Sequence, residues 1–550
     1  MSIPSESTRS FQGEHSPAEL ASLGVAKRRR EIATSRHLHQ SVRYRSAGSQ
    51  WCRTPIEALS QTSEQLSWDA ASLFSQVSLG YGCGDRMLVE QIVRQPWMSQ
   101  IGRRGEVRRE PIPVHGTRSL TAREIAERLR ELLRAEAASA CEGFSEIYVL
   151  LSGGLDSRLI AITLRDLHRE GRLRCKPVAV TWGLEDSRDV YYGRELAGQL
   201  GFDWQHVSLE PHHLIENIDI SAQRLGGLNW PTDLHRASWF RNVSPSALVL
   251  AGSEGDAIGR GESAGESVLE RRGLAPGSTY GLLRPEVIAA GTAGLTADLA
   301  ASRERASGRP RYGLFECEDE DQRHRSQLMH SIGVIDQYCH LYQMFTHPDL
   351  FSFVWSIHPA FRDDRVYRHL LALLDPELAS LPWSRTNRSV VGKTTGARRG
   401  LRREFDLYRD WIVGPLYKQL RERIDPEWFA GTGLFESAGV RQLGEAIRKD
   451  DRSLRLSGKR PYFTWLWLAT FREYAELLDQ NGKRVRSEVR PLSRHEPLPT
   501  PPKARQLSRL RLVLRQSPTL LRLFRKARRQ RLRRQALREF PITQEDRPSQ

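Results

Sequence analysis

The chain is poor in cysteine, in methionine and in long apolar runs. Its 550 residues include only six cysteines, and no two are spaced as Cys-x-x-Cys. The sequence therefore offers neither the paired ligands of a common zinc site nor a dithiol redox motif, and reduced structural thiols are expected. No apolar run approaches the roughly 18–20 residues that cross a bilayer, so no transmembrane segment is predicted. The first ten residues also lack the layout of a secretory signal, which makes a cytoplasmic location the expectation.

The overall composition is that of a globular protein, with 39% hydrophobic and 27% charged residues. The length suffices for two to four domains with a large core. The net charge is +17, but residues 501–540 carry 14 Lys and Arg against one acid, a net +13. The basic excess thus belongs to the tail, and nucleic-acid binding is not predicted for the body of the protein. The tail is a candidate contact for an acidic partner, although such helices are often just solvated or packed on their own domain.

The pattern of short apolar runs predicts an α/β fold with a parallel sheet flanked by helices on both faces. An amphipathic helix with a start signal at Thr121 comes first. Strand-like and helix-like stretches then alternate, which is typical of parallel sheets. The predicted strands are residues 147–151, 176–183, 203–209 and 247–252, and the helices are residues 119–140, 157–170 and 189–201.

The ends of the chain differ from this central part. Residues 1–40 are polar and without periodicity, which predicts disorder. Residues 41–115 contain strand-like pieces and turn signals, and residues 313–467 have a mostly helical pattern. A proline-rich linker over residues 491–505 leads into a basic amphipathic tail. We take residues 116–490 as the main domain and residues 491–550 as linker and tail.

The stretch LSGGLDS (residues 151–157) follows the first predicted strand and opens a helix. Ligands of open α/β sheets sit at the carboxyl ends of strands, and the start of a helix suits phosphate. Two glycines permit a close backbone approach, and two serines offer hydroxyl donors. Asp156 would repel phosphate, so it implies a bridging Mg²⁺. A plain strand-turn-helix corner is the alternative. The candidate ligand-binding residues are Leu151, Ser152, Gly153, Gly154, Asp156 and Ser157.

A second glycine-rich stretch, LVLAGSEGDAIGRGE (residues 248–262), also follows a predicted buried strand. It carries acids at Glu254 and Asp256. Two carboxylates around one Mg²⁺ suit a reaction that releases pyrophosphate, because the charge of the leaving group must be neutralised. A turn with exposed acids is the alternative at this position.

The two stretches together resemble one known family. SGGLDS resembles the pyrophosphate loop of ATP pyrophosphatases, which split ATP between its α and β phosphates. GSEGD resembles, in slightly altered form, the S-G-E-G-x-D-E segment of the asparagine synthetase family. The resemblance extends over roughly residues 67–467 and includes residues 181–209 and 361–386. It implies the adenine nucleotide alpha hydrolase-like fold, with ATP and Mg²⁺ as ligands.

This resemblance assigns roles to individual residues. Asp256 would share the Mg²⁺ with Asp156, and Glu254 is the candidate for the catalytic glutamate. The remaining nucleotide contacts implied are Gly252, Ser253 and Gly255 near the ribose and α-phosphate, and Val180, Thr181 and Trp182 near the base. His347 stands where the family usually has an aspartate, so the resemblance leaves the carboxylate substrate open.

The N-terminal region departs from the glutamine-using members of the family. Those members have a catalytic cysteine directly after the initiator Met, whereas position 2 is Ser2 in this sequence. Residues 79–107 still resemble the end of the glutaminase domain. We therefore expect residues 41–115 to be a truncated, inactive glutaminase-like remnant. The nitrogen would come from free ammonia, a substrate amine or a group on a peptide.

A third stretch, NRSVVGKTTG (residues 387–396), nearly spells a Walker A loop. Asn387 stands where the first glycine belongs, and Pro382 interrupts the segment before it. We therefore do not predict a Walker A site. Amide-forming relatives place a lysine from the helical region against the adenylate, which makes Lys393 a catalytic candidate. An ordinary surface lysine is the alternative.

The sequence thus predicts an ATP-dependent, AMP- and pyrophosphate-forming amide ligase of asparagine synthetase type. It would activate a carboxylate as an acyl-adenylate for attack by a nitrogen nucleophile. A lasso-peptide cyclase or a β-lactam-forming ligase is the alternative within this class. A tRNA-modifying adenylylase and a non-catalytic ATP-binding regulatory protein are alternatives from other classes.

Overall fold

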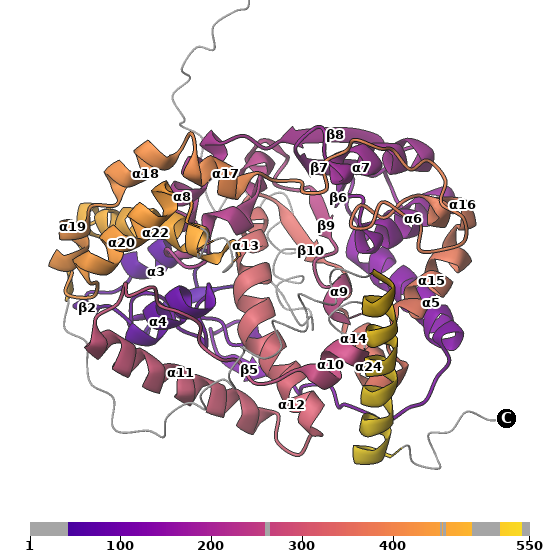
Figure 1. Cartoon of the computed structure of the whole chain (residues 1–550), viewed down its shortest axis with the longest axis horizontal. Helices are drawn as coiled ribbons and strands as arrows, with labels where there is room; N and C mark the ends of the chain where they lie inside the picture. Colours follow the sequence, from indigo (N-terminus) through magenta and orange to yellow (C-terminus); the bar gives the residue numbers. More distant parts are fainter. Residues whose placement is uncertain (1–41, 259–264, 452–453, 455–457, 487–517, 542–550) are drawn as a thin grey trace, which may run out of the picture.

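A five-stranded, wholly parallel sheet forms the centre of one half of the molecule (Figure 1). The computed structural model describes residues 42–258, 265–451, 454, 458–486 and 518–541. The strand order is β10-β9-β6-β7-β8, and Val149 of β6 pairs with Ala179 of β7 and Leu250 of β9. The strands are β6 (Ile147–Leu150), β7 (Val178–Gly183), β8 (Asp203–Ser208), β9 (Leu248–Ala251) and β10 (His340–Gln343).

The order of the strands creates a topological switch point. From β6 the chain moves outward through β7 to β8, and it then returns to the opposite side of β6 with β9 and β10. Ligands of open α/β sheets bind outside the carboxyl ends of the two strands at which the order reverses. The strand order therefore predicts that a ligand binds beyond the carboxyl ends of β6 and β9.

Helices cover both faces of the sheet, which confirms the predicted class. One face packs in a single apolar cluster with the helices α5 (Ala122–Cys141), α6 (Leu155–Arg169), α7 (Arg188–Leu200), α14 (Pro348–Ser356) and α15 (Asp364–Leu374). The other face packs with α8 (His212–Leu225), η1 (Pro231–Leu234), η2 (Ala237–Asn242) and η5 (Gly333–Gln337).

The local signals in the sequence were sufficient for most of these elements. Thr121 caps α5 and forms a reciprocal capping box with Glu124, as the start signal predicted. All four predicted strands are present. Helix α6 begins at Leu155, two residues before the predicted start, so Asp156 lies in its first turn. Strand β10 was missed, because four residues between helical stretches give too little pattern to recognise.

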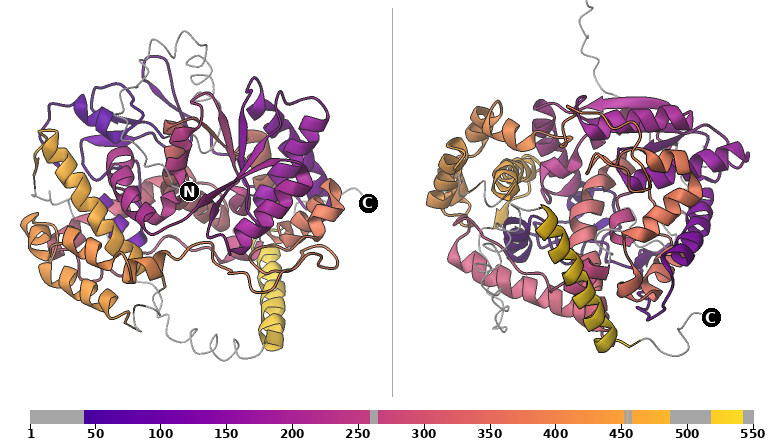
Figure 2. Two further views of the ribbon diagram at one scale, coloured as in Figure 1. Left: turned by 90° about the horizontal axis from the view of Figure 1, so that it is seen from above. Right: turned by 45° about the vertical axis from the view of Figure 1, so that its right-hand side comes forward.

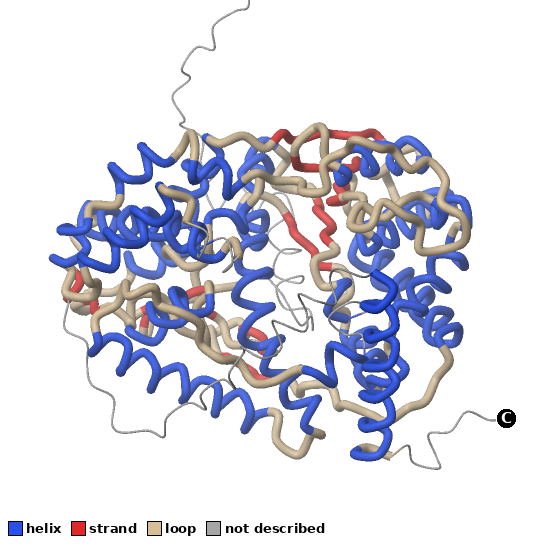
Figure 3. The backbone as a smooth tube through the Cα atoms, in the orientation of Figure 1, coloured by secondary structure: helices blue, strands red, loops and turns tan. Residues whose placement is uncertain are grey.

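The other half of the molecule is mainly helical (Figure 3). Its helices are α3 (Pro55–Ser60), α4 (Ala70–Leu79), α11 (Pro285–Arg305), α17 (Tyr408–Val413), α18 (Tyr417–Arg423), α19 (Pro426–Gly431), α20 (Ser437–Arg448) and α22 (Arg460–Gln480). Residues 42–115 add three small strand pairings, two of them among β1 (Tyr44–Ser46), β3 (Ile92–Arg94), β4 (Ser99–Ile101) and β5 (Val107–Arg109). The third joins β2 (Leu66–Ser67) to β11 (Val485–Arg486).

Residues 42–115 do not have an apolar core of their own. Phe74 of α4, Leu299 of α11 and Trp467 of α22 belong to one buried cluster. This stretch therefore depends for its packing on helices more than 200 residues away. Whether it descends from a glutaminase domain stays a prediction, as do the domain boundaries.

A long helix runs between the two halves. It comprises α12 (Arg311–Glu318), η4 (Asp319–Met329) and α13 (His330–Ile332), and its middle segment η4 is wound as a π-helix. Such segments are rare and frequently occur at functional sites. Buried polar residues of η4 bind the N-terminal region: Gln322 accepts from the N–H of Gly84 at 2.7 Å, and Arg325 pairs with Asp85 at 2.7 Å. The helix thus fixes the N-terminal region to the rest of the molecule.

The basic tail forms the helix α24 (Pro518–Glu539), which packs against α10 (Gly265–Glu270) and η6 (Pro359–Phe361) (Figures 1 and 2). Arg528 pairs with Glu270 at 2.7 Å, and Ala536 is buried. A helix in the tail is therefore confirmed, while Leu507, Leu510 and Leu514 lie outside the described residues. Among the described residues, no helix combines the length and the apolar character that spanning a membrane requires.

Arg158 of α6 binds the end of α16 (Pro376–Ser380) and the segment that follows it. Its guanidinium is buried and donates to the carbonyls of Leu378, Leu381 and Pro382 at 2.8–3.1 Å. Burial lowers the pKa of Arg158 to about 10. The same segment then brings the N–H of Ser384 within 3.0 Å of the carbonyl of Gly153. The buried guanidinium of Arg158 thus positions the segment that packs against the turn after β6.

We predict that Arg158→Met lowers the free energy of unfolding by about 3 kcal/mol, because three buried carbonyls lose their donor. Chemical denaturation followed by tryptophan fluorescence measures this loss. Arg169→Met at the exposed end of the same helix is the matched control, with an expected change below about 0.5 kcal/mol. Equal effects of the two substitutions would contradict the anchoring role of Arg158.

Candidate active site

The turn after β6 arranges two hydroxyl groups at the start of α6. The Ser157 hydroxyl accepts the N–H of Ser152 at 3.1 Å, and the Ser152 hydroxyl accepts the N–H of Gly154 at 3.1 Å. The two hydroxyl oxygens lie 3.2 Å apart. Gly154 is the N-cap of α6 and has no side chain to cap it. The first turn of α6 therefore presents N–H groups together with two hydroxyls, which is a favourable arrangement for phosphate.

The loop after β9 packs directly against this turn. A Cβ atom added to Gly255 would lie 2.5 Å from Oδ1 of Asp156, and one added to Gly252 would lie 2.8 Å from Cδ1 of Ile160. A side chain at position 255 would displace Asp156, whereas one at position 252 would displace only the tip of Ile160. Asp256 follows Gly255 in the first turn of α9 (Gly255–Ile258), just as Asp156 lies in the first turn of α6. The structure thus brings together the two glycine-rich loops that the sequence identified separately.

The end of β7 contacts the end of β6 on the side opposite β9. The Thr181 hydroxyl donates to the carbonyl of Leu151 at 2.6 Å and accepts the indole N–H of Trp204 at 3.1 Å. Val180 is buried and accepts the N–H of Leu151 at 2.9 Å. These contacts give Val180 and Thr181 a structural role at the strand end. Their contact with a nucleotide base, and that of Trp182, stays a prediction.

A half-buried carboxylate that sequence reasoning missed holds the outer side of the turn. Asp189 lies in the first turn of α7, and burial raises its pKa against the lowering effect of hydrogen bonds with the Ser384 hydroxyl and the Gly153 backbone. Asp189 and Ser384 therefore fix the backbone of the first glycine. The residues flanking the turn come from two segments about 200 residues apart, so the sequence around SGGLDS alone could not identify them.

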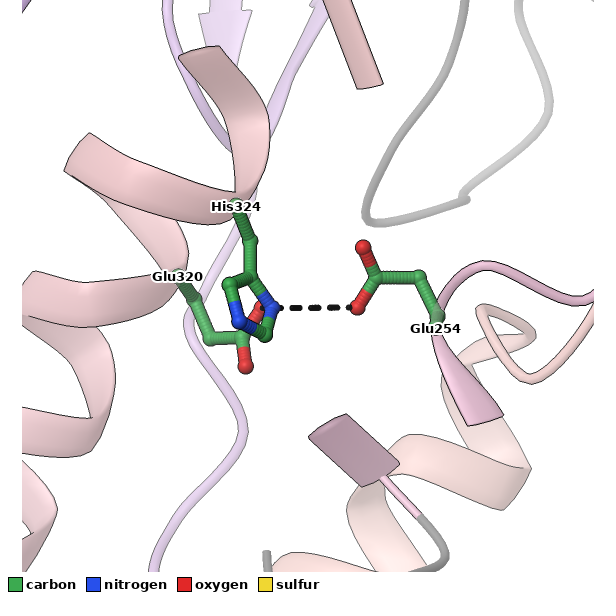
Figure 4. A group of neighbouring side chains, drawn as sticks. All are labelled: Glu254, Glu320 and His324. Atoms are coloured by element: carbon green, nitrogen blue, oxygen red, sulfur yellow. Dashed lines mark ion pairs between the residues drawn. The ribbon is translucent and has the colours of Figure 1, made fainter. Parts of the chain in front are cut away.

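Glu254 is fully buried and faces η4 (Figure 4). Its Oε2 lies 3.5 Å from Nδ1 of His324, and the same nitrogen lies 3.1 Å from Oε2 of Glu320. The sequence singled out Glu254 but neither of its partners. Glu320 and His324 belong to the highly charged run EDEDQRHR. Such a run usually indicates a solvent-exposed helical surface, but most of this one is buried between the two halves.

The structure places Lys393 on the surface, in the irregular segment after Ser384. This segment is held to α7 by a hydrogen bond from the Tyr192 hydroxyl to Asn387. Among the described residues, no interaction joins Lys393 to Asp156 or Glu254. The segment also lacks the strand before it and the helix after it that a Walker A loop requires, which confirms that the near-match is not such a loop. A catalytic role for Lys393 stays a prediction.

His347 lies just beyond the carboxyl end of β10, one strand away from β9. Its Nδ1 accepts the N–H of Asp349 at 3.3 Å and so caps α14. The backbone of this turn is held by Glu136 of α5, which accepts the N–H groups of Phe345, Thr346 and His347 at 2.9–3.1 Å. Burial raises the pKa of Glu136 to about 7, although these bonds and the Tyr342 hydroxyl lower it.

The fold and the two loops define an α/β protein with a turn rich in hydroxyl and N–H donors and two adjacent acidic helix starts at its switch point. Comparison with known families agrees with this description. Residues 128–232 match the family model described as asparagine synthase. This region runs from α5 into η1 and contains the turn at Ser152–Gly154, but it ends before the loop of Glu254. The match supports the asparagine synthase family and suggests, in general terms, an ATP-dependent amide ligase. No curated protein matched the chain.

We predict that the stability contributed by Glu136 decreases as the pH rises. Its folded-state pKa of about 7 lies above the value near 4.5 in the unfolded chain, so the folded state favours the protonated carboxyl. This contribution is fully present below about pH 4.5 and is lost as the pH rises through about 7. Relative to Glu136→Gln, the wild type should lose up to about 3 kcal/mol of unfolding free energy between pH 5 and pH 8.

Urea denaturation at four pH values tests this prediction. Glu131→Gln, an exposed position on the same helix, is the control and should follow the wild type throughout. If the free energies of unfolding of the wild type and Glu136→Gln change with pH in parallel, Glu136 is ionised in the folded protein at every pH tested.

Proposed function

We propose that the chain is an ATP-dependent amide ligase that releases AMP and pyrophosphate. The observation that carries this proposal is the contact of the two glycine-rich loops, with Gly255 against Asp156 at the switch point of the sheet. A phosphate-binding turn and two carboxylates at one strand edge are what the cleavage of ATP between its α and β phosphates requires. A carboxylate substrate would attack the α-phosphate, which gives an acyl-adenylate.

In this proposal the turn after β6 holds the phosphates that leave. The hydroxyls of Ser152 and Ser157 and the N–H groups at the start of α6 donate to phosphate oxygens. Asp156 and Asp256 fit a Mg²⁺, because carboxylate oxygens are the ligands it prefers and because Asp156 would otherwise repel phosphate. The ion would neutralise the charge that develops on pyrophosphate.

Glu254 has the position for the second half of the reaction. It precedes Gly255, so it lies beside the loop that would contact the α-phosphate, and its carboxylate is shielded from water. When a nitrogen nucleophile attacks the acyl carbon, AMP leaves and the nitrogen loses a proton, which a buried carboxylate can accept. Lys393 is the candidate for stabilising the developing charge, and this role stays a prediction.

Within this class we favour a ligase for a peptide or another natural product, of the lasso-peptide cyclase or β-lactam-forming type, over ammonia-dependent asparagine synthesis. The supporting observation is His347, which stands at the position of an aspartate in asparagine-forming relatives. Its imidazole caps a helix at the sheet edge, so this position supplies no carboxylate for an α-amino group. The nitrogen would then come from a substrate amine or a peptide.

We predict that one class of carboxylates drives ATP–pyrophosphate exchange and that Asp156→Ala reduces the exchange at least about 100-fold. A screen of amino acids, small carboxylic acids and peptides with radiolabelled pyrophosphate measures this directly. Asp166→Asn is the matched control, since Asp166 lies on the same helix and pairs with Arg165. Binding of ATP without exchange for any carboxylate would instead indicate a non-catalytic nucleotide-binding protein.

We also predict that Gly255→Ala weakens binding of Mg²⁺-ATP at least about tenfold. The added Cβ would displace the Asp156 carboxylate, which it approaches to 2.5 Å. Isothermal titration with a non-hydrolysable ATP analogue gives the dissociation constant. Gly198→Ala on α7 is the control, because no atom lies within 4 Å of its added Cβ. If both variants bind the analogue like the wild type, the nucleotide does not bind at the carboxyl ends of β6 and β9.

A further inference from the structure

Three buried side chains from two distant parts of the chain converge beside the loop of Glu254 (Figure 4). Glu254 and Glu320 have no exposed surface, and His324 is 1% exposed. Each offers one donor atom, and the three atoms all lie within 4.8 Å of one another. Glu320 and His324 are four residues apart on η4 and so share one face of the helix. The group therefore exists only when η4 is docked against the end of β9.

The spacing of the donor atoms suits a metal ion. Nδ1 of His324 lies 3.1 Å from Glu320 Oε2 and 3.5 Å from Glu254 Oε2. Donor atoms bound at about 2.0–2.2 Å to one cation are about 3.0–3.6 Å apart. One imidazole nitrogen carries at most one proton, and here it faces two carboxylate oxygens. We propose that Glu254, Glu320 and His324 form a binding site for a divalent metal ion.

The surroundings of His324 include a carboxylate near its other ring nitrogen. Its other nitrogen, Nε2, lies 3.6 Å from Oδ2 of Asp319, and Asp319 is itself held by Arg323 at 2.8 Å and by Arg271. Metal-binding histidines commonly direct their second nitrogen to a carboxylate. Arg323 Nη2 also lies 2.5 Å from Nε2. With a metal on Nδ1, Nε2 carries the proton, so Arg323 must leave Nε2 and keep its bond to Asp319.

The donor set selects the class of metal. One imidazole and two carboxylates suit Mn²⁺ or Zn²⁺, whereas Mg²⁺ and Ca²⁺ prefer oxygen donors alone. The site also differs from the magnesium site proposed for ATP, since Glu254 faces η4 while the neighbouring Gly255 faces Asp156. The metal would bind Oε2 of Glu254 and leave Oε1 as the oxygen that accepts a proton in the proposed reaction. This inference stands independently of the proposed ligase reaction.

Titration of the full-length, chelator-treated protein with Mn²⁺ in the absence of ATP tests the site, with free Mn²⁺ followed by electron paramagnetic resonance. We expect one saturable site whose dissociation constant rises at least about tenfold in Glu320→Gln and in His324→Gln. Glu318→Gln is the matched control, because Glu318 is buried on the same helix but pairs with Arg303. Glu318→Gln and Asp156→Asn should bind Mn²⁺ like the wild type.

A spectroscopic readout on the wild type covers the case in which a variant does not fold. Pulsed electron paramagnetic resonance of bound Mn²⁺ should detect one coupled imidazole nitrogen, and this coupling should be absent in His324→Gln. The proposal is overturned if the wild type binds neither Mn²⁺ nor Zn²⁺, or if the bound ion shows no nitrogen coupling. Unchanged binding in both Glu320→Gln and His324→Gln, or loss of binding in Asp156→Asn, overturns it equally.

Discussion

The close contact between Gly255 and Asp156 is the constraint on which the rest of the site depends. It requires a glycine at position 255 and fixes the distance between the starts of α6 and α9. Because β6 and β9 are neighbours in the sheet, the two turns that follow them must share one small volume. Hydroxyl and N–H donors from one turn and acidic groups from both are thereby brought to a single edge. A bulkier residue at position 255 would separate the loops.

Several buried polar groups hold this edge in place. Arg158 binds the carbonyls of the segment that supports Gly153, Asp189 binds the same glycine, and Glu136 binds the turn that ends β10. Each is an ionisable side chain wholly or partly removed from water, which costs free energy unless it is hydrogen-bonded. The folded protein tolerates this desolvation free energy at the carboxyl ends of the strands. The polar π-helix η4 does the same between the two halves, where it positions Glu320 and His324 beside Glu254.

Much of the fold could be predicted from local signals in the sequence. Apolar runs gave four of the five strands, and Thr121 gave the start of α5, because strand burial and helix capping depend on neighbouring residues. The glycine-rich loops could be found for the same reason. Glu320 and His324 could not, since a charged helical run is usually exposed and only tertiary packing buries it here. The roles of Lys393 and of the nucleotide-binding residues remain predictions, because they depend on ligands.

The proposed reaction requires that the edge between β6 and β9 binds ATP for cleavage between its α and β phosphates. A crystal structure with α,β-methylene ATP and Mg²⁺ tests it most directly. We expect the β and γ phosphates on the hydroxyls of Ser152 and Ser157, with Mg²⁺ between Asp156 and Asp256. A nucleotide bound elsewhere, for example at the segment of Lys393, or a Mg²⁺ that contacts neither aspartate, would contradict the account.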